Sequence, residues 1–578
     1  MSAIMATLIN LDRSTEPNLP FGNDQKGPFY VDEPCLSKSC GSALQAHEIS
    51  RQHHDQIVSS LAAQVRAFSE SGQRFRIYHG SSNSTRPPST GNLLDVSALN
   101  NVLSISKGDE LSGCESWCLV EPNVPMDKLV EATLPYGLVP PVVMEFPGIT
   151  VGGGFSGTSA ESSSFRCGFF SDNVHEVEMI LGNGEIVQAS NDHHRDLFHA
   201  AAGALGTLGI VTAVKLRLVP AKAFVHVRYT RLATFLPDAI GQFRKMKAGA
   251  TFEYLDAILY SKQHTVAITG TSVHDDLPEG ARIQTFSDAA DEWFYRHVRQ
   301  RTARLAPGTE VDEYVPLAEF LFRYDRGGFW VGEMGYDYFH HLIPFNRFTR
   351  WLLDDFSHTR TLYHALHATG VTRELVVQDV TVPWDRAIEL IDHLADDLAI
   401  WPLWLCPLGR ARMPTFHPVT ALSSLSSSAT DTSPDNPGPA PSPLPSLSDE
   451  MLSIGVWGWG PRDRSAFIAR NRGLEAKLEA LGGRKWLYAH VFYTEDEFWR
   501  LYDRTWYESL RDKYHATGLM SIYEKIGRSA AGDHDARGWL QTAREMWPVG
   551  GLVGMWKAVR SGDIKLHRSA KWKWIAGS

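Results

Sequence analysis

TVGGGFSGTSAESS, residues 150–163, is the stretch on which the prediction of the fold depends. Gly152, Gly154 and Gly157 follow the G-x-G-x-x-G spacing of a Rossmann dinucleotide site. Such a site needs a strand before the glycines, a helix after them and a parallel return strand. The apolar stretch LVPPVVMEFPGITV, residues 138–151, is compatible with an extended chain that leads into the glycines.

The chain after the glycines does not fit a Rossmann unit. Residues 158–173, TSAESSSFRCGFFSDN, contain no amphipathic helix of useful length. Residues 174–190, VHEVEMILGNGEIVQAS, alternate apolar and polar side chains around a Gly-Asn-Gly turn, which predicts an antiparallel hairpin. A simple surface turn is the alternative interpretation of the glycines. We favour a ligand site of another architecture, because glycine lets the backbone approach a ligand closely.

The surrounding segments predict a mixture of helices and strands. Residues 46–72 form a helical pattern with Ile57, Leu61, Val65 and Phe68 on one stripe. A second helix is expected at 125–137, and strands at 92–97, 103–108 and 116–122. Residues 196–221 predict a helix, a glycine-rich turn and a strand that ends at Pro220. The fold class expected from these patterns is α+β.

Composition limits the classes of function. The 578 residues imply more than one domain, and the net charge of −10 argues against nucleic acid as the main partner. The cysteine pairs Cys35/Cys40 and Cys114/Cys118 have no histidines at zinc-ligand spacing, so we expect reduced thiols and no metal site.

Membrane signals are weak. No apolar run approaches the ~20 residues that span a bilayer, and residues 1–20 lack the pattern of a signal peptide. We expect no transmembrane segment, and a protein that is cytoplasmic or peripherally associated with the endoplasmic reticulum membrane. The basic C-terminus carries Trp572 and Trp574, a combination that rests on anionic membrane surfaces in some proteins, but a solvated tail is the favoured interpretation.

The second half of the chain is more aromatic. A Pro/Ser-rich stretch at 423–450 is predicted to be a disordered insertion within a domain. Residues 494–516, TEDEFWRLYDRTWYESLRDKYHA, predict one strong helix that begins with a Thr494–Glu497 capping box. The predicted divisions are an irregular segment at 1–45, a nucleotide-binding domain at 46–221, a second domain at 222–530 and a tail at 531–578.

Three segments occur in an informative order: IYHGSSNST (77–85), the glycine-rich segment (150–174) and residues 196–221. Together they resemble the PCMH-type flavin-binding domain of the vanillyl-alcohol-oxidase superfamily. The resemblance implies two α+β subdomains that hold FAD between them, followed by an α+β substrate (cap) domain. The first two segments would supply backbone N–H groups to the pyrophosphate, and the third would pass close to the flavin ring. Convergent N–H donors suit a buried dianion.

The resemblance assigns the following residues to the FAD site: Gly80, Ser81, Ser82, Asn83, Ser84, Thr150, Val151, Gly152, Gly153, Gly154, Phe155, Ser156, Gly157, Thr158, Ser159, Ala160, Glu161, Ser162, Gly206, Gly209 and Ile210. Relatives that bind FAD covalently use a histidine in the first loop or a cysteine just before the glycine-rich loop. Asn83 and Phe146 stand at those places, so we expect non-covalent FAD, and we expect Cys167 to be a packed thiol.

Within the superfamily, the chain resembles the delta(24)-sterol reductase, or Diminuto, group from about residue 50 to about 526. The similar segments are GTSAESSSFRCGFF (157–170), EMILGNGEIV (178–187), GTLGIVTAVKLRLVPAK (206–222), VVQDVTVP (376–383), WPLWLCP (401–407), IGVWGWGPR (454–462) and WLYAHVFYTEDEFW (486–499). The resemblance implies reduction of an isolated C=C bond of a sterol or isoprenoid, an apolar small molecule, with FAD and NADPH. The family's N-terminal membrane anchor has no counterpart here, and neither the insertion nor the tail has one in the family. His490 stands where the family has an acidic residue.

Reduction of an isolated alkene needs a proton donor, and a neighbouring aromatic ring would stabilise cationic character at carbon. Tyr488 and His490 are the candidate acids, because WLYAHVFY alternates like a strand and would place them on one face with Phe492. The second domain offers the aromatic residues Trp401, Trp404, Trp457, Trp459, Tyr488 and Tyr493, of which we assign a minority to the pocket. The alternative functions are an FAD-dependent alcohol or sugar oxidase or dehydrogenase, and a flavoprotein scaffold without activity.

Overall fold

The structure is a computed structural model that describes residues 41–80, 91–109, 113–339, 343–362, 374–409, 414–419, 450–527 and 549–575. The chain divides after Ser42, and the features below belong to the unit Ala43–Ser578. Among the described residues, no helix has the length and apolar character needed to cross a membrane. The predicted insertion at 423–450 lies outside the described residues except for Glu450.

The first domain is built on an antiparallel sheet in the order β3-β4-β8-β6-β7, with β5 paired to β8. The predicted hairpin is confirmed, since Ile180 pairs with Ile186 across its turn. An antiparallel return excludes a Rossmann unit, as expected. The strands are β3 (Val102–Ser106), β4 (Ser116–Val120), β5 (Leu138–Val139), β6 (Val174–Ile180), β7 (Ile186–Ser190) and β8 (Ile210–Pro220).

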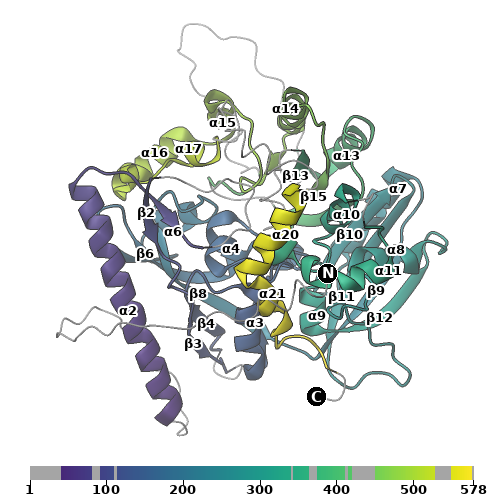
Figure 1. Ribbon diagram of the computed structural model, residues 1–578, viewed down its shortest axis with the longest axis horizontal. Coiled ribbons are helices and arrows are strands. Elements are labelled where there is room, and N and C mark those ends of the chain that lie inside the picture. The colour runs from purple at the N-terminus through teal and green to yellow at the C-terminus, as the bar shows by residue number, and fades with distance from the viewer. Residues whose placement is uncertain are drawn as a thin grey trace. The chain divides into compact units, whose positions relative to one another are not determined.

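Helices and a small sheet complete this domain. The predicted helix near residues 46–72 is confirmed as α2 (Gly41–Glu70), the long purple helix in Figure 1. Leu61 and Val65 on its predicted stripe are buried. The other elements are α3 (Met126–Thr133), α6 (Arg195–Ala201), and the parallel strands β1 (Phe75–Tyr78) and β2 (Asn92–Asp95).

A buried histidine joins α2 to the sheet. The ring nitrogens of His54 lie 2.7 Å from Glu121 Oε1 and 3.1 Å from Glu178 Oε1. Glu121 follows β4 and Glu178 belongs to β6. Burial lowers the pKa of His54, but the two carboxylates outweigh burial and raise the pKa to about 9. A positively charged imidazole therefore holds the helix on the sheet.

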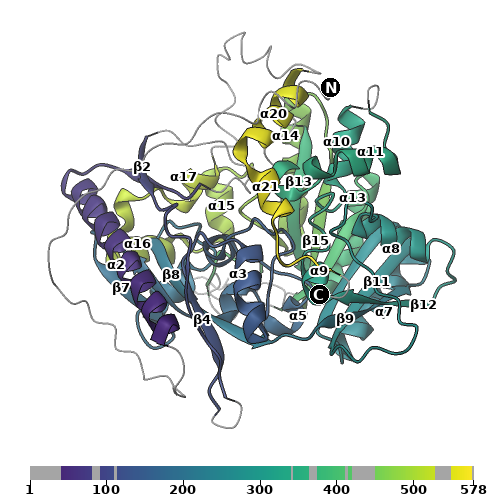
Figure 2. The same cartoon turned by 60° about the horizontal axis from the view of Figure 1, so that its bottom comes forward.

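The second domain contains an antiparallel sheet in the order β12-β9-β11-β10-β14-β15-β13-β16. In Figure 2 the strands β9, β11 and β12 lie at one end of this sheet. The strands are β9 (Phe224–Arg231), β10 (Tyr254–Ser261), β11 (His264–Val273), β12 (Glu310–Pro316), β13 (Leu375–Pro383), β14 (Leu403–Gly409), β15 (Glu450–Trp459) and β16 (Arg484–Lys485). The arrangement of two mixed domains confirms the α+β fold class.

Each strand of this sheet presents two different faces. On β13, Val376 and Val380 belong to the core formed with α7 (Leu236–Ala248), α13 (Ala387–Asp396) and α14 (Arg464–Ala480). Val377 packs against the other core, which extends into the first domain. Further helices on this side are α8 (Phe294–Thr302), α9 (Leu317–Leu321), α10 (Val331–Tyr338) and α11 (Arg347–Leu352).

The single helix predicted at 494–516 is wrong, because the segment forms α15 (Glu495–Leu501) and α16 (Arg504–Lys513). The predicted capping box of Thr494 and Glu497 is present. The break follows from a second cap, in which the Asp503 carboxylate accepts the N–H of Trp506 at 2.8 Å. Helix α16 and the following α17 (Ile522–Ile526) return to the first domain, where the Tyr507 hydroxyl donates to Thr207 Oγ1.

The strand predicted at WLYAHVFY is also wrong. Regular pairing stops after β16, and residues 486–493 form a turn at 487–489 within otherwise irregular chain. The cause is a buried ionic cluster, since the Lys485 ammonium donates to Glu475 Oε1 at 3.0 Å and to the carbonyl of His490. Glu475 also accepts the N–H of Phe492 at 2.9 Å. These contacts bend the chain and override its apolar–polar alternation.

The prediction of a solvated C-terminal tail is wrong where the tail is described. It forms α20 (Val549–Ser561) and α21 (Asp563–Arg568), drawn in yellow in Figure 1. The ring of His567 stacks on His358 with centroids 3.9 Å apart. Trp572 is buried against Phe322, and the Trp574 N–H donates to Glu319 Oε1 at 3.1 Å. Trp572 therefore packs inside the protein and is not available to a membrane surface.

Candidate active site

A cavity of about 340 Å³ lies where the two domains meet, a volume within the range of roughly 300–1,000 Å³ that is typical of small-molecule sites. The first domain contributes the glycine-rich segment, residues 205–211 and the segment around Glu145. The second domain contributes one face of β13, β14 and β15. All three segments predicted to bind FAD thus contribute to a cavity shared with the predicted substrate domain, the first of them through Ile77 and His79.

The glycine-rich segment is a short helix, α4 (Val151–Gly157), and not an open loop. A Cβ atom at Gly152 would come within 2.7 Å of Pro122, and one at Gly154 within 2.7 Å of Met144. These two glycines allow α4 to pack closely against its neighbours. Gly157, which lines the cavity, differs because a Cβ there would meet no atom within 4 Å.

The backbone after α4 offers free donors. The N–H of Gly153 is already bonded to the Thr150 hydroxyl at 3.2 Å, and the N–H of Gly152 to the Pro122 carbonyl at 2.8 Å. Ser159 and Ala160 also line the cavity, and within the described ranges their N–H groups have no hydrogen-bond partner. The residues present therefore fit a polyanionic group such as the FAD pyrophosphate, with the donors placed after the helix and not at its start.

The predicted FAD-site residues divide into three groups. Those that line the cavity are Thr150, Gly152, Gly153, Ser156, Gly157, Thr158, Ser159, Ala160, Glu161, Gly206, Gly209 and Ile210. Those that do not line it are Gly80, which is exposed, together with Val151, Gly154, Phe155 and Ser162. Ser81, Ser82, Asn83 and Ser84 lie outside the described residues.

Two carboxyl groups lie side by side in the cavity wall of the first domain. Glu145 and Glu161 are buried, and the Glu145 N–H lies 3.4 Å from Glu161 Oε1. Burial raises the pKa of both groups, and the negative charge of Glu145 adds to the rise at Glu161. Two adjacent buried carboxyl groups retain a proton more readily than one exposed group does. No sequence pattern had pointed to Glu145.

The two candidate acids are placed differently. Tyr488 lines the cavity, and its hydroxyl donates a hydrogen bond to Asp379 Oδ2. His490 does not line the cavity, and its carbonyl accepts from Gln378 Nε2 at 3.0 Å on the opposite face of β13. Asp379 lines the cavity and was missed, although an acidic residue within the apolar strand VVQDVTVP is a recognisable signal.

Aromatic rings form the wall contributed by the second domain. Trp404, Trp457 and Tyr488 line the cavity, whereas Trp401, Trp459 and Tyr493 do not. Trp486 and Phe329 complete the wall and were not anticipated. The ring of Phe329 stacks on Tyr324 at 3.9 Å and lies 4.4 Å from Trp457, with distances measured between ring centroids.

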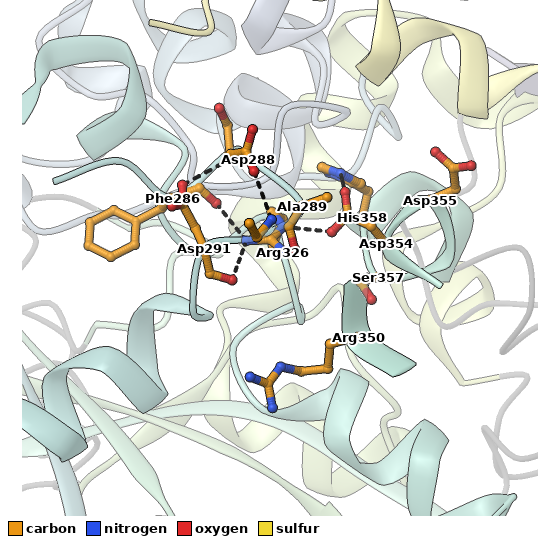
Figure 3. Close-up of polar contacts among 12 residues, drawn as sticks. Phe286, Asp288, Ala289, Asp291, Arg326, Arg350, Asp354, Asp355, Ser357 and His358 are labelled. Carbon is orange, nitrogen blue, oxygen red and sulfur yellow. Dashed lines mark hydrogen bonds and ion pairs between the residues drawn. The ribbon is translucent and has the colours of Figure 1, made fainter. Parts of the chain in front are cut away.

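A buried arginine fixes the loop that carries Phe329. Arg326 donates to the carbonyls of Phe286, Ala289 and Asp291 and to Asp354 Oδ1, and Figure 3 shows it at the centre of these contacts. The loop after it has φ values of 85° at Gly327, 50° at Gly328 and 58° at Phe329. Positive φ at a phenylalanine is strained, and such strain is maintained only by well-ordered surroundings.

The four cysteines that the structure describes do not line the cavity. Cys114, Cys118, Cys167 and Cys406 are free thiols, and Cys167 is partly buried against the core. In the part of the chain that the structure describes, no group of three or more His, Cys, Asp or Glu side chains is arranged to hold a metal ion. Cys35 and Cys40 lie outside the described residues.

A Gly157→Leu variant is expected to bind FAD about 5- to 150-fold more weakly, the effect of about 1–3 kcal/mol of overpacking. The φ angle of Gly157 lies outside the left-handed region, so leucine does not strain the backbone and its side chain enters the cavity. Titration of the FAD-free protein by flavin fluorescence measures the affinity. Gly241→Leu, on an exposed position of α7 with no atom within 4 Å of the added Cβ, is the matched control. Unchanged affinity in a folded Gly157→Leu protein would mean that FAD does not pass this residue.

Comparison with known proteins connects this site to a cofactor. Residues 57–190 match the family model described as an FAD binding domain. The delta(24)-sterol reductase of Homo sapiens is 26% identical over 500 residues, which cover 82% of this chain and 87% of that protein. The delta(24)-sterol reductase of Pisum sativum is 27% identical over 484 residues, covering 77% and 78%. Cytokinin dehydrogenase 9 of Oryza sativa subsp. japonica is 33% identical, but over 153 residues that cover 26% of this chain. The similarity to the reductases thus extends through both domains.

Proposed function

We propose that this FAD-dependent oxidoreductase reduces an isolated C=C bond in the side chain of a sterol or a related isoprenoid, with NADPH as the electron donor. The observation that carries the proposal is one cavity in which the segments predicted to bind FAD face an aromatic wall of the second domain. The similarity to delta(24)-sterol reductases over most of the chain supports the same substrate class.

FAD, when bound, supplies hydride transfer to a substrate carbon. The chain would hold its pyrophosphate with the backbone N–H groups of Ser159 and Ala160, next to Gly157, and all three residues line the cavity. An isolated alkene has no carbonyl group that a hydrogen bond would polarise. Its recognition therefore depends on shape and apolar contact, which Trp404, Trp457 and Phe329 provide.

The aromatic wall has a second role in this proposal. Protonation of an alkene carbon leaves cationic character on its neighbour, and the face of an indole ring attracts a positive charge. The Trp457 ring lies 5.3 Å from Trp330 and 4.4 Å from Phe329, centroid to centroid, so its position is well supported. The Trp330 indole N–H donates to the Trp457 carbonyl at 2.8 Å and fixes the backbone there.

The direct test is to incubate the FAD-loaded protein with NADPH and a panel of Δ24-sterols and isoprenoid alkenes. Mass spectrometry should detect a product heavier by two hydrogen atoms, and anaerobic NADPH should bleach the flavin quickly. Bleaching by alcohols or sugars and not by NADPH would contradict the proposal and support the alternative oxidase or dehydrogenase. A protein that takes up no flavin would support the scaffold without activity.

Acid precipitation is expected to release the flavin into the supernatant. Phe146 stands at one tethering position, lines the cavity and packs against Phe329 with centroids 5.8 Å apart, and a phenyl ring forms no bond to flavin. The other position, Asn83, lies outside the described residues, and its side chain is an amide. Absorbance of the supernatant measures release. Flavin that remains with the precipitated polypeptide would contradict non-covalent binding.

A further inference from the structure

We propose that Asp379 is the acid that protonates the alkene, and that Tyr488 is a positioning residue that orients the carboxyl group and tunes its acidity. The inference rests on the proposed function and deepens it. The carboxyl O–H bond breaks as a C–H bond forms at one alkene carbon, while a hydride from the reduced flavin forms the second C–H bond. NADPH supplies the two electrons, and the Asp379 carboxylate regains a proton from water between turnovers.

The position of Asp379 follows from the register of the sheet. Leu375, Val377 and Asp379 alternate along β13 and line the cavity, while Gln378 faces the opposite side and bonds to Asn471. Asp379 pairs with Gly455 on β15, which in turn pairs with Trp404 on β14. The acid thus lies within a strand that pairs along its whole length with β15, and not in a loop.

Glycine at position 455 makes room for an aromatic ring near the acid. A Cβ atom at Gly455 would lie 2.5 Å from the indole of Trp457. Trp457 pairs with Val377, the next cavity-facing residue from Asp379 on β13. The strand pairing therefore brings a proton donor and a ring that stabilises cationic character to the same face of the sheet.

The surroundings of Asp379 favour a protonated carboxyl group. Tyr488 donates to Oδ2, whereas Oδ1 is buried and has no hydrogen-bond partner in the described part of the chain. Lys485 on the neighbouring β16 does not compensate the charge, because its ammonium is bound to Glu475 and to the His490 carbonyl. Glu145 is the other ionisable group that acts on Asp379, and its carboxylate form also favours a protonated Asp379.

The acidity of Asp379 suits a reaction near neutral pH. Burial raises its pKa to about 7, the hydrogen bond from Tyr488 opposes the rise, and the charge on Glu145 adds to it. A general acid works best when its pKa lies near the working pH. A typical exposed aspartate, with a pKa of roughly 4, would be almost fully ionised there.

Four other groups are weaker candidates. The Tyr488 hydroxyl already donates its hydrogen to Asp379, and His490 does not line the cavity. Glu145 and Glu161 belong to the first domain, next to the segment that would hold FAD. Asp379 combines a place on the aromatic wall with an unpaired carboxyl oxygen, and none of the other groups combines both features.

The kinetic test separates the two half-reactions of the FAD-loaded protein. Asp379→Asn should bind FAD and accept hydride from NADPH at the wild-type rate, but reoxidation by the alkene should be slower by about 10²–10⁴-fold. Asp385→Asn, an exposed aspartate just after the end of β13, is the matched control and should reoxidise normally. The assignment would be overturned if the alkene reoxidised Asp379→Asn at the wild-type rate. It would also be overturned if only Glu145→Gln showed the slower reoxidation.

A second measurement does not depend on turnover. Infrared difference spectroscopy of the FAD-loaded protein should detect a carboxyl C=O band that titrates near pH 7 and is absent from Asp379→Asn. Tyr488→Phe should shift this titration to higher pH, because it removes the hydrogen bond that lowers the pKa. The absence of such a band in the wild type would overturn the role of Asp379. If the band is present but no alkene is reduced, the proposed substrate is wrong and the acidity of Asp379 is nevertheless established.

Discussion

An Arg323→Met variant is expected to lose about 3–5 kcal/mol of free energy of unfolding. Arg323 and Asp256 are both buried, and Arg323 Nη2 lies 3.1 Å from Asp256 Oδ2. Removal of the guanidinium leaves a carboxylate in the protein interior without a counter-charge. The hydroxyl of Tyr324 and the indole N–H of Trp404 would then be its donors, and neither carries charge.

Denaturant unfolding of the FAD-saturated protein, followed by circular dichroism, measures this loss. Arg228→Met is the matched control, because Arg228 also pairs with an aspartate but both partners are more than one third exposed, and its loss should stay below about 1 kcal/mol. Adding Asp256→Asn to Arg323→Met should recover part of the stability, since the amide retains an acceptor and removes the unpaired charge. Equal losses of the free energy of unfolding in Arg323→Met and Arg228→Met would contradict the importance of burial.

The free energy of unfolding is expected to fall at alkaline pH, because His54 loses its proton there. Its folded pKa of about 9 lies above the unfolded value of 6.5, so the protonated ring stabilises the fold fully below pH 6.5. This contribution, on the order of 3 kcal/mol, is lost as pH rises from 6.5 through 9. Asp55 is a further acidic group near the cluster, and burial raises its pKa.

The change in the free energy of unfolding with pH measures the contribution of His54. Denaturant midpoints at pH 6 and above pH 9 should differ strongly in the wild type and much less in His54→Gln. His53→Gln provides the control, because His53 is the preceding residue and lies on the exposed side of α2. If His54→Gln keeps the wild-type slope, the loss of alkaline stability has another origin.

Local sequence patterns were sufficient to predict much of the secondary structure of the first domain. The hairpin β6–β7 and helix α2 each combine an apolar period with a turn or an end signal, so neighbouring residues determine them. The break after α15 was missed although its signal is local, because Asp503 interrupts an otherwise helical pattern as the N-cap of α16.

Other features depend on contacts between distant parts of the chain. Residues 486–493 alternate like a strand, but the buried Lys485–Glu475 pair and its bonds to His490 and Phe492 impose a bend. The cavity position of Asp379 requires the pairing of β13 with β15, which is remote in sequence. Sequence alone identified Tyr488, but it could not show that Tyr488 contacts an aspartate from another strand.

The glycine-rich segment shows why a motif is an incomplete description of a site. The spacing of Gly152, Gly154 and Gly157 suggested one shared role in ligand approach. In the structure, the first two glycines permit packing against Pro122 and Met144, and the third faces the cavity. The same residue type thus meets two different steric demands within one short helix.

The docked C-terminal segment has a practical consequence for shortened versions of this protein. The resemblance to sterol reductases expected from the sequence ends near residue 526, so an expression boundary chosen from it would remove α20 and α21. That cut would uncover Phe322 and leave Asp355 without His567 and Arg568. His358, on which His567 stacks, immediately precedes Thr359 of the cavity wall. Helices α20 and α21 therefore support this part of the cavity wall, and shortened versions of the protein should retain them.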